Sequence, residues 1–300
     1  MKRLVLLAGI WGWSFLFIKV AVAGLTPSTV AALRVGLGAA VVLAFLRARG
    51  LHLPQGWQWW RHFVVVALVG SAIPFTLLAW GEQHISSALT AVLNASTPLF
   101  AALFAGLLLG DRLRPAHMAG LILGFVGVAV AVGLAVEDLT GAALGGELAA
   151  VVAGAGYGLA FAYSRRHLTP IPPVVAAGGQ LLTATVLLAP FALVTSLRQG
   201  FHPTPTRAAA VVLLGVLGTG VAYVLSYRLI ADLGPTRASL VTYLIPIVAV
   251  TVGVLFLDEA FSLRLLVGGG LTIAGIALLN VAGPPPAPVP VAPGATTGGR

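Results

Sequence analysis

Any chemistry in this chain has to come from a few polar side chains that interrupt long apolar stretches. Lys19 and Arg34 are cations within two of these stretches, and ionisable groups inside a membrane segment are costly and usually functional. Two interpretations remain open. Each cation snorkels to the membrane interface or caps the carboxyl end of a helix, or the pair draws an anionic group of a substrate. The first is favoured for Lys19, and neither is favoured for Arg34.

A proline interrupts one apolar stretch shortly after two polar residues. Asn94 and Thr97 precede Pro98, which removes a backbone hydrogen bond and frees the carbonyl of Asn94. The freed group either lines a cavity or is resealed by packing at a kink. Pro246 stands at the corresponding place of a later stretch, and helices broken twice in this way favour a binding site. A hinge in both places would give the same pattern.

Aromatic and hydroxyl side chains are spread over several of the apolar stretches. Their polar tips need partners when they are buried, and together they would suit a cavity for a zwitterion with an apolar side chain. Hydrogen bonding between helices, without any substrate, would explain them equally well. The candidates of this kind are Trp11, Ser14, Ser71, Tyr157, Tyr223 and Tyr243.

No motif of a catalytic or metal site accompanies these residues. The chain has no cysteine, and its six histidines lie in loops or at the ends of apolar stretches without ligand spacing. Neither His-Glu-x-x-His nor Gly-x-Ser-x-Gly nor a P-loop occurs. We therefore expect no enzyme, no cofactor and no metal. No Asp or Glu lies in the central third of an apolar stretch, which favours a facilitator or exchanger over a carrier with a membrane-embedded proton-binding carboxylate.

The composition places these residues in an integral membrane protein. Hydrophobic residues make up 59% of the 300 positions and charged residues 8%, and several stretches exceed the roughly 18 apolar residues of a transmembrane helix. The net charge of +9 does not indicate nucleic-acid binding, because the basic residues cluster in short turns between apolar stretches. The expected partners are the lipid bilayer and a small-molecule substrate.

Ten transmembrane helices are predicted, followed by a disordered Pro- and Gly-rich tail over 283–300. With a cytoplasmic N-terminus, twelve Lys and Arg residues fall on the cytoplasmic side and three on the other. The positive-inside rule therefore places both termini in the cytoplasm. The helices are predicted over 4–23, 28–46, 62–80, 88–109, 116–134, 147–164, 173–195, 208–228, 238–257 and 263–281.

The stretch 86–134 recurs 148 residues later in the chain. A proline, an acid and two glycines that match at one offset indicate two copies of one unit, here 1–135 and 136–282. Each copy has five predicted helices, an odd number, so the second copy must be inverted in the membrane relative to the first. The matching pairs are Pro98 and Pro246, Asp111 and Glu259, Gly120 and Gly268, and Gly127 and Gly275.

Two smaller features of this repeat allow more than one interpretation. Asp111 and Glu259 stand in turns beside helix ends, where capping is the simplest role and a gating salt bridge to a loop arginine is the alternative. Gly120 and Gly124 have the spacing that lets another helix approach closely. We expect that contact to lie within the repeat, with a dimer face as the alternative.

At this level the chain resembles the EamA-type branch of the drug/metabolite transporter superfamily over about residues 4–282. The resemblance rests on two five-helix repeats and on three patterns in the first four helices. It departs from the family in the acid after the fourth helix, usually Glu, and in the dense glycines around Tyr157. The patterns are Trp11-Gly12-x-Ser14-Phe15-x3-Lys19, Pro27-x6-Arg34, and Thr97-Pro98 followed 13 residues later by Asp111.

The resemblance implies export of small metabolites, often amino acids, from the bacterial cytoplasm. We accordingly expect a secondary transporter of the bacterial inner membrane, all-α, that works by alternating access of two inverted repeats. A homodimer is possible, but a monomer should be competent. A drug or toxin extruder of the same fold is the alternative within the class, and a channel-like pore or a non-transporting scaffold is the alternative outside it.

Overall fold

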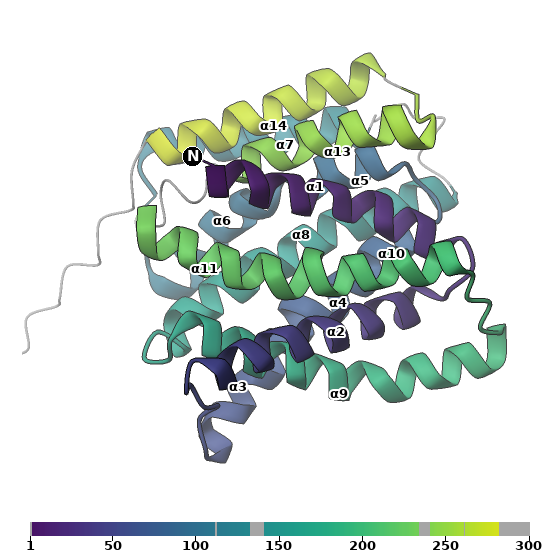
Figure 1. Cartoon of the computed structure of the whole chain (residues 1–300). Coiled ribbons are helices and arrows are strands. Elements are labelled where there is room, and N and C mark those ends of the chain that lie inside the picture. The colour runs from purple at the N-terminus through teal and green to yellow at the C-terminus, as the bar shows by residue number, and fades with distance from the viewer. Residues whose placement is uncertain (1, 112, 133–140, 234–240, 261, 282–300) are drawn as a thin grey trace, which may run out of the picture.

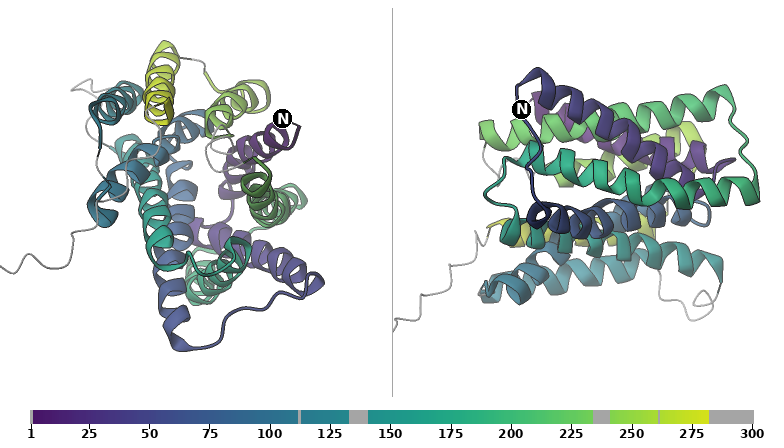
Figure 2. Two further views of the ribbon diagram at one scale, coloured as in Figure 1. Left: turned by 90° about the vertical axis from the view of Figure 1, so that its left-hand side faces the viewer. Right: turned by 90° about the horizontal axis from the view of Figure 1, so that it is seen from below.

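The computed structural model of the chain describes residues 2–111, 113–132, 141–233, 241–260 and 262–281. These residues form helices joined by connecting segments, with no β-strand among them. The helices run roughly along one common direction in Figure 1, and the end-on view in Figure 2 shows them grouped as a bundle. The predicted tail over 283–300 lies outside the described residues.

The helices fall into two groups on either side of the 133–140 segment. The first group comprises α1 (Lys2–Val22), α2 (Pro27–Ala48), α3 (Trp57–Ala67), η1 (Leu68–Ala72), α4 (Ile73–Gly81), α5 (Ser87–Asn94), α6 (Thr97–Leu109) and α7 (Pro115–Val132). The second comprises α8 (Ala142–His167), α9 (Pro173–Gln199), α10 (Pro205–Gly215), η3 (Val216–Val221), α11 (Ala222–Leu233), α13 (Val241–Leu257) and α14 (Leu263–Val281).

Most of these helices are long and apolar enough to cross a bilayer. Nine segments within the described residues meet that standard, and α13 is a shorter apolar helix of 17 residues. Large apolar side chains such as Val186, Phe191 and Leu197 are exposed along α9. Such a surface is stable against lipid tails rather than against water. The chain is a multi-pass membrane protein.

Local sequence signals explain where several helices begin and end. The Thr26 hydroxyl accepts a hydrogen bond from the N–H of Thr29, with Pro27 in the first turn, and the Ser86 hydroxyl accepts one from the N–H of Leu89. Both are side-chain caps of free N–H groups at a helix start. Gly110 ends α6 with a φ of 71°, a left-handed conformation that favours glycine.

Two membrane segments contain a π-helical turn at corresponding places. η1 joins α3 to α4, and η3 joins α10 to α11. Their first residues, Leu68 and Val216, are 148 residues apart, which is the offset of the sequence repeat. π-Helical turns inside α-helices occur often at functional sites. Gly70 of η1 lines the cavity described below, and Thr219 of η3 binds Arg34 in its wall.

The helix predicted over 88–109 is broken in its middle. α5 ends at Asn94, and α6 begins at Thr97 with Pro98 in its first turn. The hydroxyl of Thr97 donates a hydrogen bond of 2.8 Å to the carbonyl of Asn94, the group that the proline deprives of its usual partner. The second copy differs, because α13 continues through Pro246.

α7 and α14 pack against each other in antiparallel fashion through their glycines. Methyl groups added at Gly120 and Gly127 would overlap the backbone of Gly275 and of Thr272, respectively, and one added at Gly268 would overlap Ala131. Gly120 therefore contacts a helix of the second half, so the prediction that it packs within the first repeat is wrong. A methyl group at Gly124 would instead overlap the Leu99 side chain of α6, in the first half, as predicted. Only glycine allows backbones to approach this closely.

The two ends of the bundle are held by different polar contacts. At the Arg165 end, where α1 begins and α8 ends, the Arg165 guanidinium binds the Asp111 carboxylate at 2.7 Å. At the opposite end, here the Glu82 end, Arg207 donates to the carbonyl of Ala23 at 3.1 Å. The α1–α2 and α9–α10 connections both lie at this second end (Figure 1).

Candidate functional site

A cavity of about 580 Å³ lies between the helices of both groups. α1, α2, α4, α5, α6, α8, α9, α11 and α13 contribute side chains to its wall. At the Arg165 end it reaches Arg165 and Thr169, where the Arg165 side chain is 59% exposed. Eight of the candidates from the sequence line it: Trp11, Ser14, Arg34, Asn94, Thr97, Pro98, Tyr157 and Tyr223.

Arg34 is a buried cation in the wall of this cavity. Its side chain is only 7% exposed, its Nε donates to the Thr219 hydroxyl at 2.9 Å, and its guanidinium lies 3.8 Å from the centre of the Phe75 ring. Among the described residues no carboxylate forms an ion pair with it. The arginine does not snorkel to an interface. It presents a positive charge to a mostly apolar cavity.

The two π-helical turns hold polar side chains from the opposite half of the chain. Thr219 of η3 binds Arg34 of α2, and Ser71 of η1 accepts a hydrogen bond of 2.9 Å from the Gln180 amide of α9. Gln180 also donates to the carbonyl of Gly70 at 3.2 Å, which satisfies a backbone group that the π-turn leaves available. Ser71 itself lies just behind the cavity wall.

The break between α5 and α6 places an unpaired acceptor at the cavity. Asn94 lines the wall, and its side-chain oxygen is buried without a hydrogen-bond partner among the described residues. Buried polar atoms are rarely left in this state, because each lost hydrogen bond costs about 1–3 kcal/mol. An unpaired amide oxygen in a cavity wall can accept a hydrogen bond from a bound donor.

The rest of the wall is largely apolar and aromatic. Tyr157 packs against Phe75 with ring centres 6.0 Å apart, and Trp11, Phe15 and Phe161 line the same space. Such surfaces bind apolar groups, whereas a few polar atoms fix orientation. Arg165 at the mouth is paired with Asp111. The cavity thus offers the Arg34 cation and the Asn94 oxygen, which has no partner among the described residues, within a largely apolar enclosure.

Four of the predicted site residues lie outside the cavity wall. Pro246 is buried within α13, and Tyr243 binds the Asn280 amide of α14. Ser71 sits behind the wall, as described above. Lys19 lies at the Glu82 end, where its ammonium donates to two backbone carbonyls, of Glu82 at 2.6 Å and of Ile85 at 2.8 Å. Lys19 therefore has the helix-end role that the sequence favoured for it.

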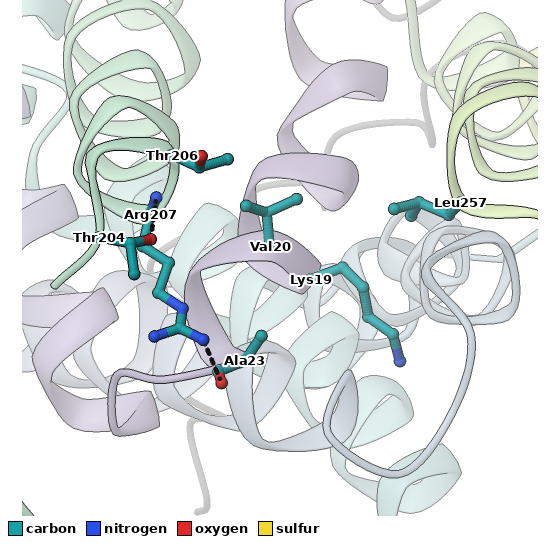
Figure 3. Close-up of a pocket in the computed structure, with 7 residues that line it drawn as sticks. All are labelled: Lys19, Val20, Ala23, Thr204, Thr206, Arg207 and Leu257. Atoms are coloured by element: carbon teal, nitrogen blue, oxygen red, sulfur yellow. Dashed lines mark hydrogen bonds between the residues drawn. The ribbon is translucent and has the colours of Figure 1, made fainter. Parts of the chain in front are cut away.

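A second hollow, of about 470 Å³, opens at the Glu82 end beside Lys19 and Arg207 (Figure 3). Its cations are not available to a ligand. The Arg207 guanidinium binds the carbonyls of Ala23 and His202, and the Lys19 side chain points away from Arg207 in the close-up. These contacts fasten connecting segments together rather than forming a site.

The two acids of the repeat have different roles in the two halves. The Glu259 carboxylate accepts hydrogen bonds from the N–H groups of Ser87 (2.7 Å) and Ala88 (3.0 Å), so it caps α5 across the two halves. Asp111 instead forms the ion pair with Arg165 at the mouth of the cavity. Glu259 therefore has the capping role expected for these acids, whereas Asp111 has the alternative role, a salt bridge to an arginine.

Sequence reasoning missed Thr219 and Phe75, which position Arg34. A signal for Thr219 was present, because Thr219 stands 148 residues after Ser71 and the repeat pairs the two hydroxyls. Phe75 follows a proline in an apolar run, and nothing in that run marks it as a partner of Arg34. Its contact with the Arg34 guanidinium depends on the packing of α2 against α4, which the sequence does not show.

Comparisons with known proteins agree with this architecture. The family model described as the EamA-like transporter family matches residues 3–133 and 144–281. The "Probable terminal-alkyne amino-acid exporter" of Streptantibioticus cattleyicolor is 32% identical over 285 residues, 92% of each chain. The "Uncharacterized transporter YoaV" of Bacillus subtilis is 23% identical over 269 residues, 89% of this chain and 91% of that protein.

A solved structure shares the fold. One protein crystal structure superposes with a TM-score of 0.65 and 25% identity, over 94% of this chain and 97% of the other. The family model covers nearly all of the membrane-spanning part of the chain. This chain belongs to the EamA-like transporter family.

Proposed function

We propose that this protein is a secondary transporter of the bacterial inner membrane that exports amino acids or related small metabolites. The observation that carries the substrate class is Arg34, a buried cation in the wall of the cavity that forms no ion pair with any carboxylate in the described part of the chain. A carboxylate of the substrate would supply the missing partner through charge-assisted hydrogen bonds. The relative named as an amino-acid exporter supports the same class.

The remaining wall fits the other groups of an amino acid. The unpaired oxygen of Asn94 accepts a hydrogen bond from an ammonium group, and the aromatic wall around Tyr157 and Trp11 takes an apolar side chain. A zwitterion with an apolar side chain therefore uses each feature of the cavity. We propose this substrate over a cationic drug, because the Arg34 charge repels cations in a low-dielectric space.

Alternating access of two inverted repeats is the proposed mechanism. The α7–α14 contacts support it because they are reciprocal: Gly120 meets Gly275, and Gly127 meets the turn of Gly268. With an offset of 148 residues, Gly120 corresponds to Gly268 and Gly127 to Gly275. A two-fold axis between antiparallel helices produces this exchange of partners. The division into 1–135 and 136–282 follows the same symmetry.

The state described here is proposed to face the cytoplasm. The cavity reaches the surface at the Arg165 end, and Lys2, Arg3, Arg47, Arg49 and Arg166 belong to the same end of the bundle, which the positive-inside rule assigns to the cytoplasm. The Glu82 end is closed by the contacts of Lys19 and Glu259. A cavity open at one end only supports a carrier rather than a pore.

Each chain holds a complete cavity, so we propose that a monomer is sufficient. α14 of the same chain occupies the space next to Gly120 and Gly127, and Leu99 of α6 the space next to Gly124, which leaves no support for a dimer through Gly120 and Gly124.

Counterflow in proteoliposomes tests the proposed function. Vesicles loaded with an unlabelled amino acid should accumulate the labelled one transiently and saturably, for apolar amino acids more than for charged ones. Drug cations and sugar phosphates serve as the comparison panel, and ionic currents under voltage report a pore. Flat uptake of every amino acid by folded, inserted protein would overturn the amino-acid assignment.

A further inference from the structure

A buried carboxyl group lies at the closed end of the bundle, apart from the proposed substrate cavity. Glu82 directly follows α4 and has no exposed surface (0%). Neither of its carboxyl oxygens has a hydrogen-bond partner among the described residues. An ionised carboxylate buried without partners is far more costly than the neutral acid. Burial accordingly raises the pKa of the Glu82 carboxyl well above its ordinary value.

The charged groups facing Glu82 come from three other elements. Lys19 of α1 and Arg34 of α2 act to lower its pKa, and Glu259 beyond α13 acts to raise it, with burial the largest influence. The Lys19 ammonium donates to the backbone carbonyl of Glu82, so it forms no ion pair with the carboxyl group. The cations therefore do not replace the lost hydration of an ionised Glu82.

Two other elements pack along α4. α8 carries Glu147, itself 8% exposed, near its start, and a methyl group at Gly81 would meet the carbonyl of Gly146. η1 contains no ionisable residue. His84 follows Glu82 in the same connection and packs against Trp80 with ring centres 4.5 Å apart. None of these groups forms an ion pair with Glu82 in the described part of the chain.

Glu82 sits among the contacts that hold this end shut. Lys19 fastens α1 to the α4–α5 connection through the carbonyls of Glu82 and Ile85. Glu259 fastens the end of α13 to the start of α5 through the N–H groups of Ser87 and Ala88. Opening this end separates those elements and lets water reach the carboxyl group.

We propose that Glu82 is a proton-binding site that controls the Glu82 end: the end closes when Glu82 has taken a proton from solution and opens when it loses that proton. The proposal rests on the alternating-access function proposed above and adds a ligand to it, the proton. The carboxylate and the proton combine to a neutral acid that the closed structure buries. Loss of the proton leaves a charge that only the hydrated, open arrangement accommodates.

The direction of the pH effect follows from linkage. The open state has an ordinary carboxyl pKa and the closed state a raised one, so the closed state binds more protons between the two values. Raising the pH through this window favours the open state by up to about tenfold for each pH unit. Below the open-state pKa both states are protonated, and the pH has no effect.

A single-cysteine reporter tests the proposal without a substrate. The chain has no cysteine of its own, and Ser87 is 1% exposed beneath Glu259, with an unpartnered hydroxyl. Ser87→Cys should react with a membrane-impermeant maleimide only when this end opens. The rate is measured on the purified full chain with Glu82 and with Glu82→Gln, at about pH 5.5 and about pH 8.5. Comparison at one pH cancels the titration of the thiol itself.

The expected result is a faster reaction with Glu82 than with Glu82→Gln at the higher pH, and a much smaller difference at the lower pH, which lies closer to the ordinary carboxyl pKa of the open state. Glu147→Gln is the matched control and should behave as the parent. Glu82→Met, also permanently neutral, replaces Glu82→Gln if that variant does not fold. Equal rates at both pH values, or an equal effect of Glu147→Gln, would overturn the proposal. The counterflow experiment tests the transport function independently of this labelling experiment, so the two proposals can fail separately.

Discussion

Ser71 and Thr219 stand 148 residues apart in the two π-helical turns, and each binds a polar side chain from a helix of the other half. Thr219 accepts from Arg34, and Ser71 accepts from Gln180. The first half therefore positions the amide, and the second half positions the cation of the cavity. In the proposed alternating-access mechanism, movement of the halves against each other would move Arg34 relative to Thr219.

Replacing Arg34 should weaken substrate binding more than it affects stability. Arg34→Gln removes the partner of the proposed carboxylate, and hydrogen bonds to a charged group are worth about 1.5–3 kcal/mol. The substrate concentration at half-maximal counterflow should therefore rise about ten- to a hundredfold. Thermal unfolding in detergent should change little, since the variant also removes a buried charge that has no ion-pair partner among the described residues. Arg207→Gln, outside the cavity, is the control, and an unchanged half-maximal concentration in Arg34→Gln contradicts the role.

Replacing Asn94 should discriminate between substrates. Asn94→Ala removes the free amide oxygen, so an amino acid should lose about 1 kcal/mol of binding. The corresponding acid without its amino group should bind the variant and the parent equally well. Competition of both compounds against labelled counterflow measures the two affinities. Equal losses for both compounds would mean that Asn94 does not contact the ammonium group.

Closer packing of α7 and α14 should not be tolerated. Gly275→Ala places a methyl group against the backbone of Gly120 and Gly124, and overpacking of this kind costs about 1–3 kcal/mol. The melting temperature in detergent should fall. Gly270→Ala on the same helix meets nothing within 4 Å and should leave it unchanged. An equal melting temperature for the two variants would contradict the close contact of Gly275 with Gly120 and Gly124.

Loss of Lys19 should open the Glu82 end. Lys19→Met removes both hydrogen bonds to the α4–α5 connection, at a cost of more than about 1 kcal/mol. Cysteine at position 87 should then react at least about fivefold faster. Lys2→Met, at the opposite end of the bundle, provides the control. A reaction rate as low as in the parent would show that Lys19 does not hold this end closed.

The membrane-spanning helices could be predicted from the sequence because the length and hydropathy of an apolar stretch are enough to identify one. The sequence predicted part of the break at Asn94, because Pro98 marks the carbonyl that loses its hydrogen bond. Only the structure shows that the Thr97 hydroxyl donates to that carbonyl. In the second copy the same proline leaves α13 continuous. Sequence identity at one position therefore does not determine whether a helix ends there, because the partners of the freed carbonyl differ.

Glu82 shows why the site could be predicted only in part. Glu82 lies outside the central third of any apolar stretch, a position that does not indicate a membrane-embedded proton-binding carboxylate, yet packing buries it completely. Position along a helix does not determine burial, which depends on how neighbouring helices cover each face. The role of Phe75 could not be predicted for the same reason, since its contact with Arg34 depends on how α4 packs against α2. For Thr219 the sequence carried a signal, its place 148 residues after Ser71.

Competition against counterflow of a labelled apolar amino acid tests the central claim, that Arg34 binds the carboxylate of the substrate. Three unlabelled compounds are compared: the amino acid, its amide without a carboxylate, and its acid without an amino group. Both carboxylates should compete and the amide should not, and Arg34→Gln should abolish this preference. An amide that competes as well as the amino acid, with or without Arg34, would contradict the account.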